Sequence, residues 1–311
     1  MAALRPADRE RGIALVIVLW VLALLVVLVL EFTGSARTEL QIARNQEATA
    51  RASAIADAGV TYAVLGMLDP TPATQWRGDG QEHVLSYGGG TIHVGVQDEG
   101  GKIDLNDAPP EMLRGLFRTL GVEDDAADQI VAAILTRRKE LTSASDTSLA
   151  AQLSNPSQAA LQRPFLAVEE LRLVPGVTAE IYNRVAKFLT VHGDGGQVNP
   201  VTAPAEVLRS LPGADPSSVA AFIAGRSQLG ATTGALPPLP GVQGIAVAPV
   251  QTFTVTSRGL TANGATFIRE AMTALTGAPD RPVQFLSWRQ ALDDTAPAEE
   301  SPGAEQGAAA R

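Results

Sequence analysis

The pattern of hydrophobic and polar positions near the start of the chain is typical of one long helix. Residues 13–30 are an unbroken apolar run that follows a charged segment. As a helix this run is about 27 Å long, close to the hydrocarbon thickness of a bilayer. From Phe32 to Leu65, small and apolar residues recur at helical spacing with charged residues between them, and the next proline is Pro70. We therefore expect a continuous helix over residues 13–69, with residues 13–30 in a membrane.

Period-two patterns that flank glycine-containing turns predict a small antiparallel sheet after this helix. One hairpin is expected over residues 83–97, and a second hairpin turns at residues 262–264. A last strand contains Trp288. The sheet is therefore expected to be split in the sequence, with its halves in residues 70–100 and 246–291.

Residues 101–245, between the two halves of the sheet, have a helical pattern that contains a repeat. Residues 101–116 align with residues 196–211, and each copy has an Ala-Pro pair before a predicted helix. Proline is favoured in the first turn of a helix, and the side chain of Asp107 or Thr202 is expected to cap it. The repeat is thus explained by helix starts, and the segment is predicted to be an inserted α-helical domain.

Two segments of the inserted domain, residues 173–185 and 211–223, resemble helix-hairpin-helix units. Such units hold a DNA phosphate on backbone N–H groups of a Gly-x-Gly turn. The second glycine is replaced here by Thr178 in one copy and by Asp215 in the other, and a carboxylate repels a phosphate. Helix packing is the favoured interpretation. The alternative is a membrane-anchored DNA-binding protein of a DNA-uptake or type IV pilus system.

The composition narrows the function further. The chain has 24 Lys and Arg against 33 Asp and Glu, a formal net charge of −9, which disfavours nucleic-acid binding. It has no cysteine, which excludes disulfides and thiolate metal sites. No nucleophile elbow, phosphate loop or zinc peptidase motif occurs. Adjacent carboxylates do not face one another on a helix, so the pairs Asp98-Glu99, Asp124-Asp125 and Glu169-Glu170 are expected on solvated faces. The sequence therefore predicts no enzyme. Residues 292–311, rich in Pro, Ala, Gly and Glu, are expected to be disordered.

Three interpretations of the apolar run lead to different mature proteins. Arginines precede the run, so the N-terminus is expected to stay in the cytoplasm and the remainder to be exported. A signal peptide would be removed before Arg37, and a plain signal anchor would stay intact. A type III leader would be cut on the cytoplasmic side between Gly12 and Ile13 and would leave the apolar helix at the new N-terminus. The helical stripe continues in phase beyond the run, which favours the leader over a removed signal peptide. A membrane-anchored helical stalk would have the same sequence pattern, so this feature alone does not distinguish the leader from an anchor.

Several segments taken together resemble one family. They are RGIALVIVLWVLALLVVLVLEF with the following SARTELQIARN and ADAGVTYAV, then GGKIDLNDAPPEMLR, PFLAVEELRLVPGVTAEIYNRVAKFLTV, GQVNPVTAPAEVLRSLPG and RPVQFLSWRQ. As a set, over residues 9–290, they resemble the general secretion pathway protein K family of minor pseudopilins. The resemblance implies an α+β, pilin-like fold: a long N-terminal helix packed on a small antiparallel sheet, with a large inserted α-helical domain that contains helix-hairpin-helix-like repeats.

The resemblance also implies how the chain is processed and where it works. A prepilin peptidase would remove the cytoplasmic leader, residues 1–12, by cutting after Gly12, and would methylate the amine of Ile13. The chain would lie in the inner membrane with its C-terminal domain in the periplasm. As a minor pseudopilin at the tip of the type II secretion pseudopilus, it would initiate assembly and support protein export. Its partners would be I- and J-type minor pseudopilins, the major pseudopilin, the prepilin peptidase and the inner-membrane assembly platform.

Ile17 is the fifth residue of this mature chain, where most pilins and pseudopilins have Glu. A carboxylate inside a bilayer is costly unless it is paired, and in related filaments it pairs with the N-terminal amine of the subunit above. A subunit with nothing above it has no partner for that Glu, which indicates the tip. The alternative is that the Glu was lost in a subunit that tolerates its absence.

Members of the family can bind calcium in the helical insert, which directs attention to its carboxylates. The corresponding loop, residues 135–165, has one Glu and one Asp, Glu140 and Asp146. The other candidate ligands precede the first helix of the insert; they are Asp98, Glu99, Asp104, Asn106 and Asp107. Calcium needs about six to eight oxygens, so a polar turn with helix caps is favoured over a metal site, and no cofactor is predicted.

Overall fold

A computed structural model describes residues 7–71, 74–143, 164–193, 195–228 and 237–291. The predicted disordered segment, residues 292–311, lies outside these residues, as does most of the loop 135–165. In chain order the elements are α1 (Ala7–Met67), β1 (Asp79–Tyr87), β2 (Gly90–Asp98), η1 (Glu99–Gly101), β3 (Ile103–Asp104), α2 (Pro110–Thr119), α3 (Asp124–Ser143), η2 (Val168–Leu173), α6 (Ala179–Val185), η3 (Ala186–Phe188), β4 (Leu189–Thr190), α7 (Ala205–Ser210), α8 (Pro216–Gln228), β5 (Thr252–Thr261), β6 (Thr266–Ala278) and β7 (Arg281–Gln290).

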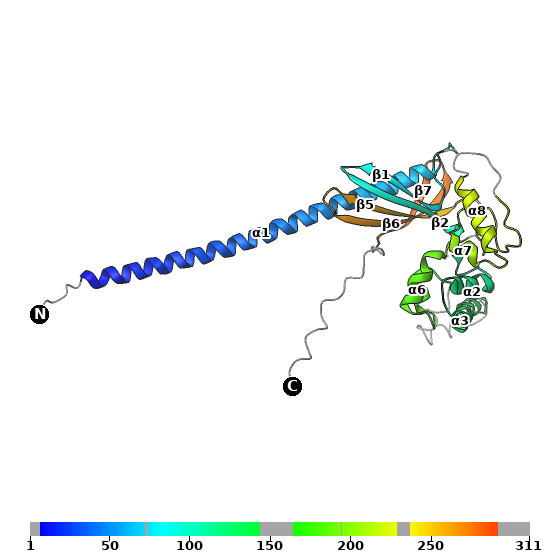
Figure 1. Ribbon diagram of the computed structural model, residues 1–311, viewed down its shortest axis with the longest axis horizontal. Coiled ribbons are helices and arrows are strands. Elements are labelled where there is room, and N and C mark those ends of the chain that lie inside the picture. Colours follow the sequence, from blue (N-terminus) through cyan, green and yellow to red (C-terminus); the bar gives the residue numbers. More distant parts are fainter. Residues whose placement is uncertain (1–6, 72–73, 144–163, 194, 229–236, 292–311) are drawn as a thin grey trace, which may run out of the picture.

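The expected long helix is present as α1, which begins at Ala7 rather than at Ile13. Its N-terminal part projects from the rest of the molecule (Figure 1), and the large apolar side chains from Leu15 to Leu28 are 50–74% exposed. Within the part of the chain that the structure describes, no helix is both long and apolar enough to cross a membrane. The C-terminal turns of α1 pack on the sheet and bury small and aliphatic side chains such as Ala56 and Val60.

The sheet is antiparallel throughout, with the strand order β1-β2-β5-β6-β7. Strands that precede residue 100 join strands that follow residue 250 where β2 pairs with β5, from Gly90↔Thr261 to Asp98↔Phe253. The last strand, β7, contains Trp288 as expected. The combination of helices with an antiparallel sheet confirms the predicted α+β class.

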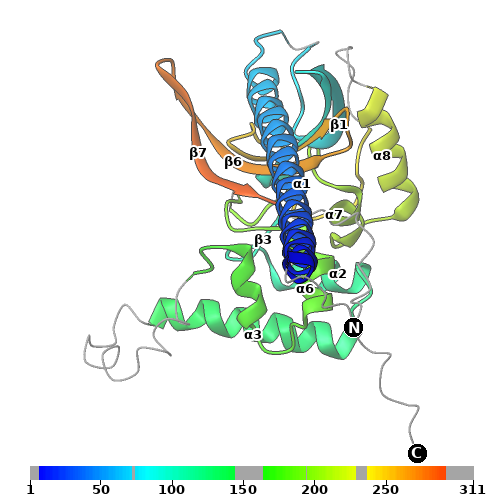
Figure 2. The ribbon, with the colours of Figure 1, turned by 90° about the vertical axis from the view of Figure 1, so that its left-hand side faces the viewer.

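Two separate hydrophobic cores stabilise the chain, and they share no residue among those described. One core lies between α1 and the sheet and includes Ile55, Ile92 and Phe253. The other fills the inserted helical domain and includes Phe117, Ile130 and others. Figure 2 shows α2, α3 and α6 of the inserted domain grouped together outside the sheet. The inserted domain therefore has its own core and meets the sheet through other contacts.

The two aligned segments of the inserted domain start their helices in the same way. Pro109 precedes α2 with φ −57° and ψ 148°, and Pro204 precedes α7 with φ −58° and ψ 153°. In both segments the alanine before the proline donates to a carbonyl four residues earlier: Ala108 N to Asp104 O at 3.1 Å, and Ala203 N to Asn199 O at 3.0 Å. The helices α2 and α7 therefore begin with similar backbone geometry, in agreement with the Ala-Pro pair that the two aligned segments share.

The expected side-chain caps by Asp107 and Thr202 are wrong. Neither α2 nor α7 has a side-chain cap, because the N-cap position is occupied by the proline itself. A capping side chain must belong to the N-cap residue, and Asp107 and Thr202 lie two residues before it. The Thr202 hydroxyl donates instead to Asp98, and the Asp107 side chain is exposed.

Candidate functional site

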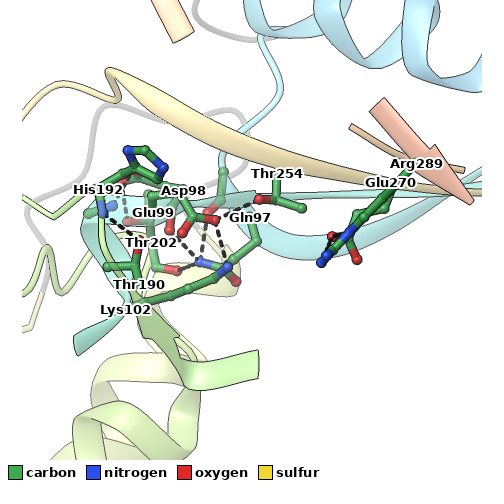
Figure 3. A network of polar contacts seen from close by, with 12 residues as sticks. Gln97, Asp98, Glu99, Lys102, Thr190, His192, Thr202, Thr254, Glu270 and Arg289 are labelled. Atoms are coloured by element: carbon green, nitrogen blue, oxygen red, sulfur yellow. Dashed lines mark hydrogen bonds and ion pairs between the residues drawn. The ribbon is translucent and has the colours of Figure 1, made fainter. Parts of the chain in front are cut away.

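A polar network at the junction of the sheet and the inserted domain is the candidate functional site (Figure 3). It gathers the predicted ligands Asp98 and Glu99, which are 2% and 1% exposed. The sequence positions them because β2 ends at Asp98, where the chain leaves the sheet and enters the short helix η1. Two neighbouring carboxylates at this depth need hydrogen-bond donors or cations to compensate for lost hydration.

Asp98 is held by uncharged donors. Its Oδ1 accepts from the backbone N of Gly100 at 3.0 Å, and its Oδ2 accepts from Thr202 Oγ1 at 2.7 Å and Asn199 Nδ2 at 3.3 Å. Burial raises the pKa of Asp98 above its ordinary value, although these three hydrogen bonds favour the charged form. The carboxylate thus joins the last residue of β2 to the second aligned segment of the inserted domain.

Glu99 is the charged partner in the network. Its Oε1 accepts from Lys102 Nζ at 2.6 Å and from Thr254 Oγ1 of β5 at 2.7 Å. The neighbouring Gln97 donates through Nε2 to the carbonyl oxygens of Thr202, at 3.0 Å, and Gly78, at 3.3 Å. Glu99 therefore bridges the inserted domain and the sheet through Thr254.

The other predicted ligands, Asp104, Asn106 and Asp107, lie a few residues farther along the chain, between β2 and α2. Asp104 accepts through Oδ1 from the backbone N of Asp107 at 3.2 Å and through Oδ2 from the backbone N of Gly193 at 2.7 Å. The side-chain amide of Asn106 exchanges two hydrogen bonds with the backbone of Phe165, at 3.0 and 2.8 Å. These contacts close the loop before α2 against distant parts of the inserted domain.

The geometry explains these carboxylates as structural groups. Their oxygens accept from protein donors, and the described residues contain no cluster of three or more His, Asp or Glu side chains suited to a metal ion. The side chains of Glu140 and Asp146 lie outside the described part of the chain. The hydrogen-bond partners of these carboxylates therefore fit a polar connection between the two units better than a calcium site.

In the two helix-hairpin-helix-like segments, Thr178 and Asp215 occupy the position of the second glycine. Each side chain caps the helix that follows. Thr178 Oγ1 accepts from the backbone N of Ile181 at 3.2 Å at the start of α6. Asp215 Oδ2 accepts from the backbone N of Ser218 at 2.8 Å at the start of α8, and the hydroxyl of Ser217 lowers the pKa of this carboxyl. The side chains of Thr178 and Asp215 therefore bind backbone N–H groups at the starts of the helices that follow the two turns.

Sequence reasoning missed a third turn of this type between α2 and α3. Gly121 has φ +80°, comparable with Gly176 at +89° and Gly213 at +79°, and α3 begins three residues later. A signal was present in the sequence, because Leu-Gly-Val occurs in a similar place before an apolar helix. A positive φ at each of these turns explains why glycine occupies it.

Sequence reasoning also missed a second contact between the sheet and the inserted domain. Arg289 of β7 donates through Nη2 to Glu270 Oε1 of β6 at 2.5 Å and through Nη1 to Glu169 Oε1 of η2 at 2.5 Å. The hydrogen bond to Glu169 raises the pKa of Arg289 above its ordinary value, so the guanidinium stays charged. The expectation of a solvated face is confirmed for Glu169, whose side chain is 45% exposed. It is wrong for Glu170, whose side chain is 16% exposed and pairs with Arg137.

Apolar side chains remain exposed on the face of the sheet beside α1. A groove of about 540 Å³ runs along α1 next to β6, between a line of α1 side chains and Phe267. On β7, the Phe285 and Trp288 side chains are 48% and 45% exposed and meet edge to face at 5.2 Å between ring centroids. Exposed aromatic residues next to a groove are typical of surfaces that contact other proteins.

Comparison with known proteins shows that the chain is similar to members of one family. Residues 96–194 match the family model described as Type II secretion system (T2SS), protein K. A relative, the type II secretion system protein K of Pectobacterium carotovorum subsp. carotovorum, is 26% identical over 208 residues, which cover 58% of this chain and 63% of the relative. The crystal structure of the GspK-GspI-GspJ complex from the enterotoxigenic Escherichia coli type 2 secretion system is similar at 15% identity and a TM-score of 0.49, covering 83% of this chain and 99% of that chain. The family resemblance inferred from the sequence is confirmed.

Proposed function

We propose that this chain, a member of the type II secretion system protein K family, is a minor pseudopilin at the tip of a pseudopilus. There it initiates assembly and supports protein export across the outer membrane. The observation that carries the proposal is the family match over residues 96–194 in a chain whose helix α1 projects from the sheet. The exposed apolar side chains between Leu15 and Leu28 support it, because such a surface is stable only against lipid or other apolar side chains.

The proposed role gives the apolar helix two successive environments. Residues 13–30 first anchor the chain in the inner membrane, with the N-terminus in the cytoplasm and the sheet and inserted domain in the periplasm. They then become part of the filament core. Lipid tails are as apolar as leucine side chains, so the exchange of lipid contacts for helix–helix contacts is close to balanced in free energy. Extraction of the helix by a cytoplasmic motor is therefore feasible.

The proposed maturation uses Gly12 and Ile13, both in the helical backbone of α1. A prepilin peptidase cuts between them and methylates the new amine of Ile13. Ile17, which is 57% exposed, then takes the position of the Glu that most pseudopilins have. An uncharged residue there suits a subunit with no neighbour above it, because no amine is available to pair with a carboxylate.

The proposed architecture is pilin-like, with α1 and the sheet regions 70–100 and 246–291 as the pilin part and residues 101–245 as the inserted domain. The proposed partners are I- and J-type minor pseudopilins, the major pseudopilin, the prepilin peptidase and the inner-membrane assembly platform. The exposed groove beside α1 and the aromatic residues of β7 are surfaces available to such partners. The proposed role is structural, with no enzymatic activity, no cofactor and no nucleic acid.

Deletion of the gene tests this function in the organism that encodes the chain. Loss of secretion of type II substrates is expected, with recovery on expression of the wild-type chain. A Gly12→Val variant, which blocks the leader cut, is expected not to restore secretion. Normal secretion in the deletion strain would contradict the proposal. Binding of double-stranded DNA by the purified chain with a steep salt dependence would favour the DNA-binding alternative.

A further inference from the structure

The contacts that join the inserted domain to the sheet are polar. The two hydrophobic cores do not merge among the described residues, and hydrogen bonds and ion pairs connect the two units instead. Units that share a large apolar interface are held in one orientation, whereas a polar interface leaves relative motion as the default. The orientation of the inserted domain therefore depends on a few identifiable side chains.

Both chain connections to the inserted domain meet at Asn199. Its backbone N donates to Gly100 O at 2.7 Å, beside the entry from β2. Its Nδ2 donates to Asp98 Oδ2 at 3.3 Å and to Ala248 O at 2.9 Å, beside the return to β5. Entry and exit thus converge on one buried residue. This arrangement is a pivot, because rotation about a single point leaves both connections intact.

A third contact lies close to the same pivot. Arg77, which precedes β1, donates through Nη1 to the carbonyl oxygen of Arg226 at the end of α8, at 2.9 Å. The Arg226 side chain donates in turn to the carbonyl oxygen of Pro200 at 3.0 Å, and Pro200 follows Asn199 in the chain. This contact therefore belongs to the pivot and does not fix the far side of the inserted domain.

The ion pair of Glu169 with Arg289 lies away from the pivot. Thr254, which contacts Glu99 at the pivot, is on β5, and Arg289 is on β7, two strands farther across the sheet. Two strand spacings correspond to on the order of 10 Å. Figure 3 shows the Glu270–Arg289 pair standing apart from the Asp98 network. A contact at this distance fixes the rotation that the pivot alone allows.

We propose that the Glu169–Arg289 ion pair is a salt-sensitive latch that holds the inserted domain in one orientation about a pivot at Asn199. The latch opens without stranding a buried charge, because Arg289 keeps its contact with Glu270 and its side chain is 54% exposed. Glu169 is 45% exposed and becomes hydrated. Exposed ion pairs are weak and are screened by salt. The inference goes beyond the proposed function and does not depend on it.

Distance measurement between two spin labels tests the latch in the full-length chain in detergent. The chain has no cysteine, so Ser86→Cys on β1 and Asp125→Cys on α3 provide unique sites on exposed side chains of the two units. The Glu169→Gln variant opens the latch, and Glu180→Gln, the same change at an exposed position of the inserted domain, is the matched control. Double electron–electron resonance then reports the distribution of orientations.

One dominant narrow distance, with a small second population, is expected for the wild-type chain at low salt. The Glu169→Gln variant, or a rise in salt from about 0.05 M to about 1 M, is expected to increase a second population about two- to fivefold. The Glu180→Gln control is expected to match the wild-type chain. Distributions of Glu169→Gln and wild type that coincide at both salt concentrations would overturn the proposal. So would equal broadening in Glu180→Gln. If the variant does not fold, the salt titration of the wild-type chain decides alone.

Discussion

At the scale of single residues, the junction is held by a carboxylate that lacks a cation of its own. Glu99 has the ammonium of Lys102 as a partner, whereas among the described residues the donors to Asp98 are a hydroxyl, an amide and a backbone N–H. Burial without a countercharge disfavours the ionised form, which is the physical cause of the raised pKa of Asp98. The network therefore connects the two units, although burial of the Asp98 carboxylate lowers the stability of the folded chain.

The pH dependence of unfolding tests this description of Asp98. The pKa of Asp98 is higher in the folded chain than in the unfolded chain. At a pH between the two pKa values, the folded chain therefore binds a proton that the unfolded chain does not. Stability is therefore expected to rise as the pH falls from the folded-state pKa toward the ordinary Asp value of about 3.9. Chemical denaturation of wild type and Asp98→Asn across this range measures the effect. The wild-type chain is expected to gain stability relative to Asp98→Asn on acidification, and a constant difference would contradict the assignment.

The residue scale is also where sequence reasoning reached least far. Asp98 and Glu99 were expected on a solvated face and were considered only as weak calcium ligands, yet they are 2% and 1% exposed. Their partners Thr202 and Thr254 lie more than a hundred residues away in the chain. No local pattern encodes that proximity. The same limit explains why the ion pair of Glu169 with Arg289, which belongs to the last strand, was not predicted. Hydrogen-bond partners of this kind follow from the tertiary fold and not from sequence spacing.

At the scale of elements, α1 and the sheet approach closely because both sides of the contact contain a glycine at a tight position. A Cβ at Gly259 of β5 would lie 2.4 Å from Ala52 O and 2.6 Å from Ala56 N, both in the backbone of α1. A Cβ at Gly59 of α1 would lie 2.6 Å from a side-chain carbon of Ile92 on β2. The spacing between helix and sheet is thus set by the absence of side chains at these positions.

Substitution of Gly259 tests the importance of this close approach. Gly259→Ala is expected to push α1 away from β5 and to lower the free energy of unfolding by about 1–3 kcal/mol, as overpacking of a tight core does. The matched control is Gly95→Ala on β2, where the nearest atom to an added Cβ would be 3.6 Å away. Thermal unfolding of the two variants measures the difference. Equal midpoints for Gly259→Ala and Gly95→Ala would show that the contact is looser than described.

Most elements could be predicted from the sequence because their signals are local. The helical stripe before Pro70 predicted α1, and the glycines at 88–90 gave the β1–β2 turn its backbone freedom, with φ +59° at Gly88 and +75° at Gly89. The pairing of β2 with β5 is not local, yet the alternation on both sides of the inserted domain indicated one divided sheet. The caps of α2 and α7 were mispredicted because proline takes the N-cap position itself.

At the scale of the whole molecule, the chain combines a projecting apolar helix, a sheet that carries it and an inserted domain with a separate core (Figure 1). The family match, over residues 96–194, covers the end of β2 and about the first two thirds of the inserted domain. In the proposed function, the apolar helix passes from a membrane to a filament, and the proposed latch sets the orientation of the inserted domain there.

The most direct test of this account is the mass of the mature protein isolated from cells that secrete normally. Our account predicts a chain that starts at N-methylated Ile13, because removal of the charged leader frees the apolar helix to pack against neighbouring subunits. Intact-mass spectrometry with N-terminal peptide mapping measures this start. A chain that retains residues 1–12 would identify a simple anchor, and a chain that starts at Arg37 would identify a secreted protein. Either result would contradict the proposed function.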